Sequence, residues 1–168
     1  RGLRKRGRSF TERPMAKKAV RVFLDSNVIL SGLLSDEGAP RIILDILCLK
    51  FPFLIGITGR YNIIQIERNL VKKLPSVLPI YKEYLPKLNL EIIPMPSSED
   101  VSRYSGDISD KDLPVLVSAI KGKADFLVTG DKKDLSRLRF KTGYPFKILN
   151  PAEFIDTIFP VILREFNV

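Results

Sequence analysis

The chain has 168 residues, is 45% hydrophobic and carries a formal net charge of +9, which is the composition of a single soluble domain with a sizeable core. It contains no histidine and one cysteine, Cys48, so histidine-based triads, histidine-containing zinc sites and an internal disulfide are excluded, and a bound metal must have oxygen ligands. No apolar run approaches the roughly 20 residues of a membrane-spanning helix, so we expect a cytoplasmic protein without membrane segments.

The positive charge is concentrated at the start of the chain. Residues 1–14 contain six arginine or lysine residues and one glutamate, and they show no apolar pattern that could pack into a core. We therefore expect a disordered basic leader or tag at 1–14, with Met15 as the natural start, and one folded domain over residues 15–168. If the leader is native, it is instead expected to contact nucleic acid.

The first half of the chain alternates between runs typical of buried strands and runs with helical spacing. Strands are predicted at residues 19–25 and 51–58, and helices at 26–34, 41–50 and 59–74. The segment 75–88 is also expected to be helical, although Pro79 and Pro86 interrupt it.

The second half continues the alternation. Strands are predicted at 90–95, 124–131 and 145–149, and helices at 97–104, 113–122, 132–138 and 150–159. Helices between successive strands require parallel pairing. The predicted fold class is therefore α/β, with one parallel sheet that carries helices on both faces.

Four acidic residues stand at informative points of this scheme. Asp25 ends the first strand, Asp112 opens the helix before the fourth strand, and Asp131 follows that strand. Glu67 lies in the middle of the helix at 59–74. Because open parallel sheets bind ligands at the carboxyl ends of their strands, the three aspartates are expected to meet there.

Each acid also has a structural explanation. Asp25, Asp112 and Asp131 could cap the helices that follow them. Glu67 could form an exposed pair with Arg68 or Lys73. Together, however, four converging acids would repel one another unless a cation compensates their charge. A site with only oxygen ligands selects Mg²⁺ or Mn²⁺, which can activate water and neutralise charge on a phosphate. This chemistry suits the hydrolysis of a phosphodiester.

Several segments carry a resemblance to a known family: "VFLDSNVIL" (22–30), Glu67 in its helix, "DLPVLVSAIKGKADFLVTGD" (112–131) and "ILNPAEFI" (148–155). From about Lys18 to Phe159 the chain resembles the PIN domain, a family of metal-dependent ribonucleases. The "VTGD" and "ILNPAEF" motifs are most similar to the branch of toxins from prokaryotic toxin–antitoxin pairs.

The resemblance implies a site and a topology. The acids that match the acidic quartet of the family, and would hold one or two Mg²⁺ or Mn²⁺ ions, are Asp25, Glu67, Asp112 and Asp131. Polar residues that would orient these carboxylates by hydrogen bonds are Ser26, Asn27 and Thr129. Asp110 or Asp107 could assist Asp112 or substitute for it. The resemblance also implies a five-stranded sheet of order 3-2-1-4-5 and a homodimer or higher homo-oligomer.

A nuclease also needs a positive surface for its substrate, because phosphates dominate the affinity for nucleic acid. The candidate residues are Arg41, Arg60, Lys72, Lys73, Lys132, Lys133, Arg137 and Arg139. Of these, Lys132 and Lys133 adjoin Asp131. The sequence thus predicts a metal-dependent endoribonuclease that acts as a toxin and is blocked by an antitoxin protein. The alternative is a catalytically inactive PIN-like module that binds RNA or protein.

Overall fold

The computed structural model describes residues 18–106, 108–131, 133–140 and 143–167. The expected leader at 1–14, Asp107 and Lys132 lie outside these ranges. Five strands form one parallel sheet in the order β4-β3-β2-β5-β6, which is 3-2-1-4-5 along the chain, as predicted. Their bounds are β2 (Val20–Leu24), β3 (Leu54–Gly59), β4 (Glu91–Ile93), β5 (Phe126–Val128) and β6 (Lys147–Leu149).

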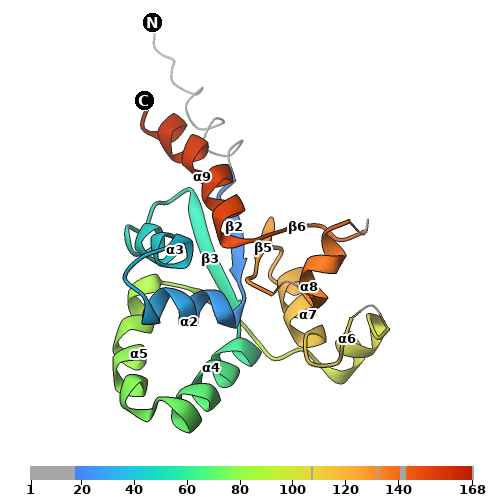
Figure 1. Cartoon of the computed structure of the whole chain (residues 1–168). Helices are drawn as coiled ribbons and strands as arrows, with labels where there is room; N and C mark the ends of the chain where they lie inside the picture. The colour runs from blue at the N-terminus through green and yellow to red at the C-terminus, as the bar shows by residue number, and fades with distance from the viewer. Residues whose placement is uncertain (1–17, 107, 132, 141–142, 168) are drawn as a thin grey trace, which may run out of the picture.

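Helices cover both faces of this sheet, which confirms the predicted α/β class (Figure 1). The helices are α2 (Ser26–Leu34), α3 (Ala39–Cys48), α4 (Arg60–Lys73), α5 (Leu78–Tyr84), α6 (Ser98–Arg103), α7 (Leu113–Lys121), α8 (Asp134–Arg137) and α9 (Pro151–Glu165). Short 3₁₀ turns are η1 (Pro75–Val77), η2 (Leu85–Leu88) and η3 (Leu138–Phe140). None of the described helices is long and apolar enough to cross a membrane.

The core consists of two clusters, one on each face of the sheet. Strand β2 contributes to both, because successive side chains of a strand point to opposite faces. Val22 and Leu24 pack with α2, α3 and α9, whereas Phe23 packs with α7. All three side chains are fully buried, as expected for the central strand of a parallel sheet.

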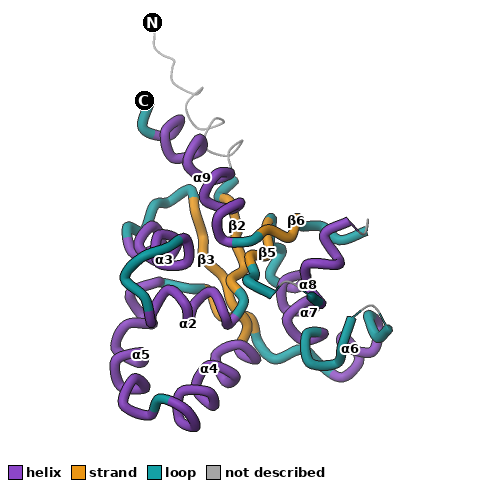
Figure 2. The backbone as a smooth tube through the Cα atoms, in the orientation of Figure 1, coloured by secondary structure: helices purple, strands orange, loops and turns teal. Residues whose placement is uncertain are grey.

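The strand order creates a switch point beside β2. From β2 the chain runs outward to β3 and β4, and then returns to place β5 on the other side of β2. Figure 2 shows the strands as one band between the two groups of helices. The segments that follow β2 and β5 therefore leave the sheet side by side and diverge, which is where open α/β sheets form ligand sites.

Helix α9 is longer than the predicted helix at 150–159. It continues to Glu165 through Pro160, although proline removes one backbone hydrogen bond from a helix. Beyond the proline, Val161 and Ile162 pack against the core cluster of α2 and α3. This apolar contact compensates for the missing hydrogen bond and extends the helix.

Helix α9 begins with the capping arrangement that its sequence indicates. The Asn150 side chain accepts a hydrogen bond from the Glu153 backbone at 2.8 Å, and the Glu153 carboxylate accepts one from the Asn150 backbone at 2.8 Å. Replacing Asn150 with alanine is expected to lower the free energy of unfolding by about 1 kcal/mol. Urea unfolding of Asn150→Ala measures this change. The control is Asp156→Ala, at an exposed position on the same helix, whose free energy of unfolding should stay within about 0.5 kcal/mol of that of the parent. Equal stability of the two variants would contradict a role for the cap.

Candidate active site

Asp25 lies at the switch point, immediately after β2, and its side chain is 6% exposed. Its Oδ1 accepts hydrogen bonds from the Ser26 backbone at 2.8 Å and from Asn62 Nδ2 at 3.2 Å. Its Oδ2 accepts from Thr129 Oγ1 at 2.8 Å and from Asn27 Nδ2 at 3.4 Å. Both carboxylate oxygens are therefore held in place by side chains from α2 and α4, by the α2 backbone and by Thr129, the residue that follows β5.

The electrostatics of Asp25 show that other carboxylates are near. Burial raises the pKa of Asp25, and hydrogen bonds from Thr129 and Ser26 oppose that rise. The negative charges of Asp112 and Asp131 raise this pKa further. Three of the four predicted acids thus share one region, in which a cation would relieve both their mutual repulsion and the cost of burial.

Asp112 reaches this region from the start of α7 and is 7% exposed. Its Oδ2 accepts a hydrogen bond from Ser109 Oγ at 3.1 Å. Asp110, which we expected to assist Asp112, is exposed and forms no hydrogen bond with a described residue. Ser109 therefore provides the support that the sequence suggested for Asp110, while Asp107 lies outside the described ranges.

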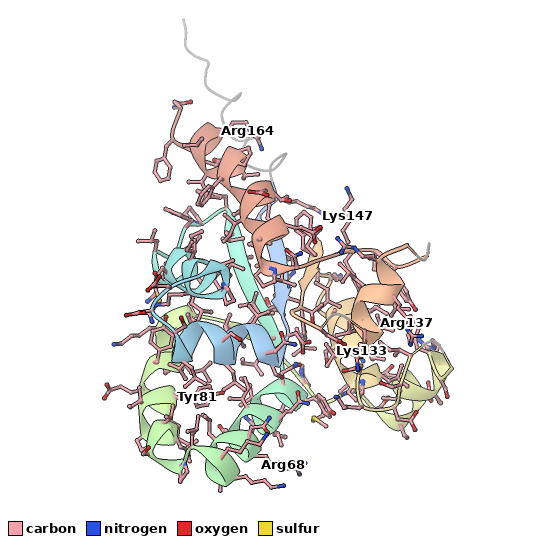
Figure 3. The ribbon with its side chains drawn as sticks, viewed as in Figure 1. Arg68, Tyr81, Lys133, Arg137, Lys147 and Arg164 are labelled. Atoms are coloured by element: carbon pink, nitrogen blue, oxygen red, sulfur yellow. The ribbon has the colours of Figure 1, made fainter. Side chains whose placement is uncertain are left out.

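Asp131 has a capping contact as well as its place near Asp25. Its Oδ1 accepts from the Lys133 backbone at 2.8 Å, and its Oδ2 accepts from the Leu135 backbone at 3.1 Å, at the start of α8. Its own backbone donates to Thr129 Oγ1 at 3.0 Å, so the threonine hydroxyl connects Asp131 to Asp25. The side chain of Lys133 is exposed beside this loop (Figure 3), and Lys132 lies outside the described residues.

Glu67 is not brought to this cluster. Helix α4 directs Asn62 to Asp25 and Gln65 to Ser26 Oγ, the latter at 2.7 Å. Glu67 lies about 160° around the helix from Gln65 at 3.6 residues per turn. Its charge instead contributes to the rise in the pKa of Tyr81, to about 12, which burial causes primarily. Figure 3 shows Tyr81 directed inward from α5, so Glu67 faces α5 rather than Asp25.

The side chains of α4 that reach Asp25 and Ser26 are therefore amides, and we did not identify them from the sequence. Asn62 and Gln65 are three residues apart in a stripe that continues to Asn69, which is a signal that the sequence does contain. Asn62 is fully buried, and its Oδ1 has no hydrogen-bond partner among the residues that the structure describes. The same amide donates from Nδ2 to Ser26 Oγ at 2.9 Å.

The chemical types of the side chains in this region are those that bind a hard divalent cation. Carboxylate, amide and hydroxyl oxygens lie around Asp25, and the chain contains no histidine that could compete as a ligand. Among the described residues, no group of three His, Cys, Asp or Glu side chains is arranged to hold a metal ion. Mg²⁺ commonly binds through only one or two carboxylates and several waters.

Comparisons with known proteins agree with this fold. A family model described as PIN domain matches residues 21–133, which is more than half of the chain. Among solved structures, 16 chains match, whereas no curated protein sequence does.

Two of the solved structures are complexes with DNA. VapBC2 from Rickettsia felis, bound to a DNA fragment from its promoter, matches with a TM-score of 0.55 and 17% identity, over 78% of this chain and 98% of that chain. DNA-bound VapBC from Salmonella typhimurium matches with a TM-score of 0.53 and 12% identity, over 79% of this chain and 98% of that chain. At these identities the likeness is one of fold.

Proposed function

The chain belongs to the PIN domain family, and from this premise we propose that it is a ribonuclease that hydrolyses RNA phosphodiester bonds with the help of Mg²⁺ or Mn²⁺. PIN domain proteins are generally nucleases. The observation that carries the proposal is the carboxylate cluster at the switch point, where Asp25 and Asp112 are buried and the Thr129 hydroxyl connects Asp25 to Asp131. A protein that only bound RNA would gain nothing from this negative charge beside phosphates.

The residues that would hold the cation are Asp25 and Asp112, with Asp131 at the side of the site. When bound, the cation would activate a water molecule and neutralise charge that develops on the phosphate. Thr129, Ser26 and Asn27 orient Asp25 through their hydrogen bonds, so the ligand oxygens need little rearrangement before the ion binds. Lys132 and Lys133 would contact the RNA strand beside Asp131.

We further propose that the protein acts in the cytoplasm as the toxin of a toxin–antitoxin pair, with an antitoxin protein that covers the site. The similarity in fold to the VapBC complexes supports this assignment. The "VTGD" and "ILNPAEF" motifs also support it. A homodimer or higher homo-oligomer is proposed on the same grounds.

One observation favours a second candidate, a catalytically inactive PIN-like module that binds RNA or protein. The α4 side chains that reach Asp25 and Ser26 are the amides Asn62 and Gln65 rather than a carboxylate. A site with one acid fewer binds a divalent cation less strongly.

The decisive experiment uses labelled single-stranded RNA, with Mn²⁺ or with a chelator, and compares the parent protein with Asp112→Asn. We expect cleavage by the parent in Mn²⁺, none in the chelator, and a rate lowered at least about a hundredfold in the variant. Addition of excess Mn²⁺ after the chelator should restore the parent rate. Equal product from parent and variant would attribute the cleavage to a contaminant, and no product with any metal would favour the binding module.

A further inference from the structure

One face of α4 borders a hollow of about 640 Å³ that extends away from the acidic site. Its lining consists of Tyr61, Ile64, Gln65, Arg68, Asn69, Lys72 and Met95, and we call it the α4 groove. Six of these residues recur at helical spacing and form one continuous stripe of the helix. The stripe spans about 16 Å at 1.5 Å per residue, which is longer than a single nucleotide.

The α4 groove begins at the acidic site. Gln65 belongs to its lining and also accepts the hydrogen bond from Ser26 Oγ, one residue after Asp25. Tyr61, at the same end, donates from its hydroxyl to the Lys111 carbonyl at 2.9 Å, and Lys111 directly precedes Asp112. A chain that lies in the groove would therefore arrive between Asp25 and Asp112.

The charge of the groove is positive and is not compensated. Arg68 and Lys72 are exposed, the lining contains no acidic residue, and neither cation forms an ion pair with any residue in the described ranges. Being four residues apart, the two like charges lie next to each other on the helix and repel. No acid stands three or four residues from either one. In Figure 3, Arg68 extends outward from α4 at the bottom of the view.

The groove also offers apolar surface between its charges. Tyr61 and Ile64 are partly exposed, and Met95, which lines the groove from the segment after β4, is 50% exposed. Surfaces on which cations alternate with aromatic and apolar side chains bind single-stranded nucleic acid without sequence preference. The cations contact the phosphates, and the aromatic and apolar side chains contact the faces of the bases.

We propose that the α4 groove holds the single-stranded RNA substrate on one side of the scissile bond, with Arg68 and Lys72 contacting its phosphates. The inference rests on the proposed nuclease function and adds the path by which the strand reaches Asp25 and Asp112. It assigns positions on α4 to RNA binding in addition to Lys132 and Lys133.

RNA affinity of the full chain tests the proposal. Binding of a labelled 12-nucleotide RNA is measured by fluorescence anisotropy from 50 to 300 mM salt in the Asp112→Asn background, which keeps the RNA intact. Adding Arg68→Ala and Lys72→Ala is expected to weaken binding on the order of tenfold and to reduce the slope of log K against log salt by about 1.4. The matched control adds Lys82→Ala and Lys87→Ala, two exposed lysines on α5 and η2, and should leave the slope unchanged. Circular dichroism verifies that all variants are folded.

The outcomes distinguish a failure of the groove proposal from a failure of the proposed nuclease function. If the parent cleaves RNA but the groove variant binds it as well as the control does, the groove proposal is overturned and the nuclease stands. If the wild-type protein neither cleaves nor binds RNA, both fail. If a ten-residue polyglutamate peptide binds the parent more tightly than RNA does, and the groove variant loses that binding, the groove belongs to an acidic protein partner instead.

Discussion

Replacement of Asp25 with asparagine is expected to lower the rate of metal-dependent RNA cleavage by about a thousandfold, which corresponds to ~4 kcal/mol of lost transition-state stabilisation. Asp25 lies at the centre of the site, because it accepts hydrogen bonds from Asn62 on α4 and from Thr129 after β5, and because the charges of Asp112 and Asp131 raise its pKa. An asparagine keeps the size of the side chain but removes the negative charge that would attract the cation.

Thermal unfolding with and without Mn²⁺ shows whether this loss arises from metal binding. A cation that binds only the folded state raises the melting temperature, so the wild-type protein should be stabilised and Asp25→Asn should not. The matched control is Asp156→Asn, the same chemical change at an exposed position on α9. If Asp25→Asn cleaves at the wild-type rate, or retains the Mn²⁺-dependent shift, Asp25 is not a ligand.

Conversion of Gln65 to glutamate is expected to raise the affinity for Mn²⁺ ten- to a hundredfold, since affinity for a hard cation increases with the number of charged ligands. Gln65 Oε1 already accepts a hydrogen bond from Ser26 Oγ, and a carboxylate can keep that contact. The new side chain would add a fourth negative charge to the cluster of Asp25, Asp112 and Asp131. Without metal, the same charge should lower the melting temperature through repulsion.

Isothermal titration calorimetry of the metal-free protein measures the affinity, and Glu67→Gln is the matched control. Glu67 faces the opposite side of α4, so its neutralisation should change the affinity less than about twofold. If Glu67→Gln weakens binding tenfold while Gln65→Glu has no effect, Glu67 rather than Gln65 is the α4 side chain that lies next to the cation.

Much of the architecture could be predicted from the sequence because the signals are local. Asp25 ends a short apolar run and Thr129 and Asp131 end another, so their places at the carboxyl ends of two parallel strands follow from the strand pattern alone. The start of the helix predicted at 150–159 likewise agrees with the observed start of α9 at Pro151. Its end could not be predicted, since Pro160 is a local stop signal that packing of the following residues overrides.

What the sequence by itself determined is a parallel α/β sheet with helices on both faces and, through the absence of histidine, oxygen as the ligand type for any bound metal. The strand order 3-2-1-4-5 and an orienting role for Thr129 were implied by the resemblance to the PIN domain. What only the tertiary structure decided is which side chains of α4 face that site. Asn62 and Glu67 both lie next to the apolar stripe that α4 buries. The apolar pattern in the sequence predicts this stripe, but it does not predict which side of the stripe faces Asp25. The rotation of α4 depends on its non-local packing against α2, α5 and α7. It turns two amides toward Asp25 and Ser26, whereas the charge of Glu67 acts on Tyr81.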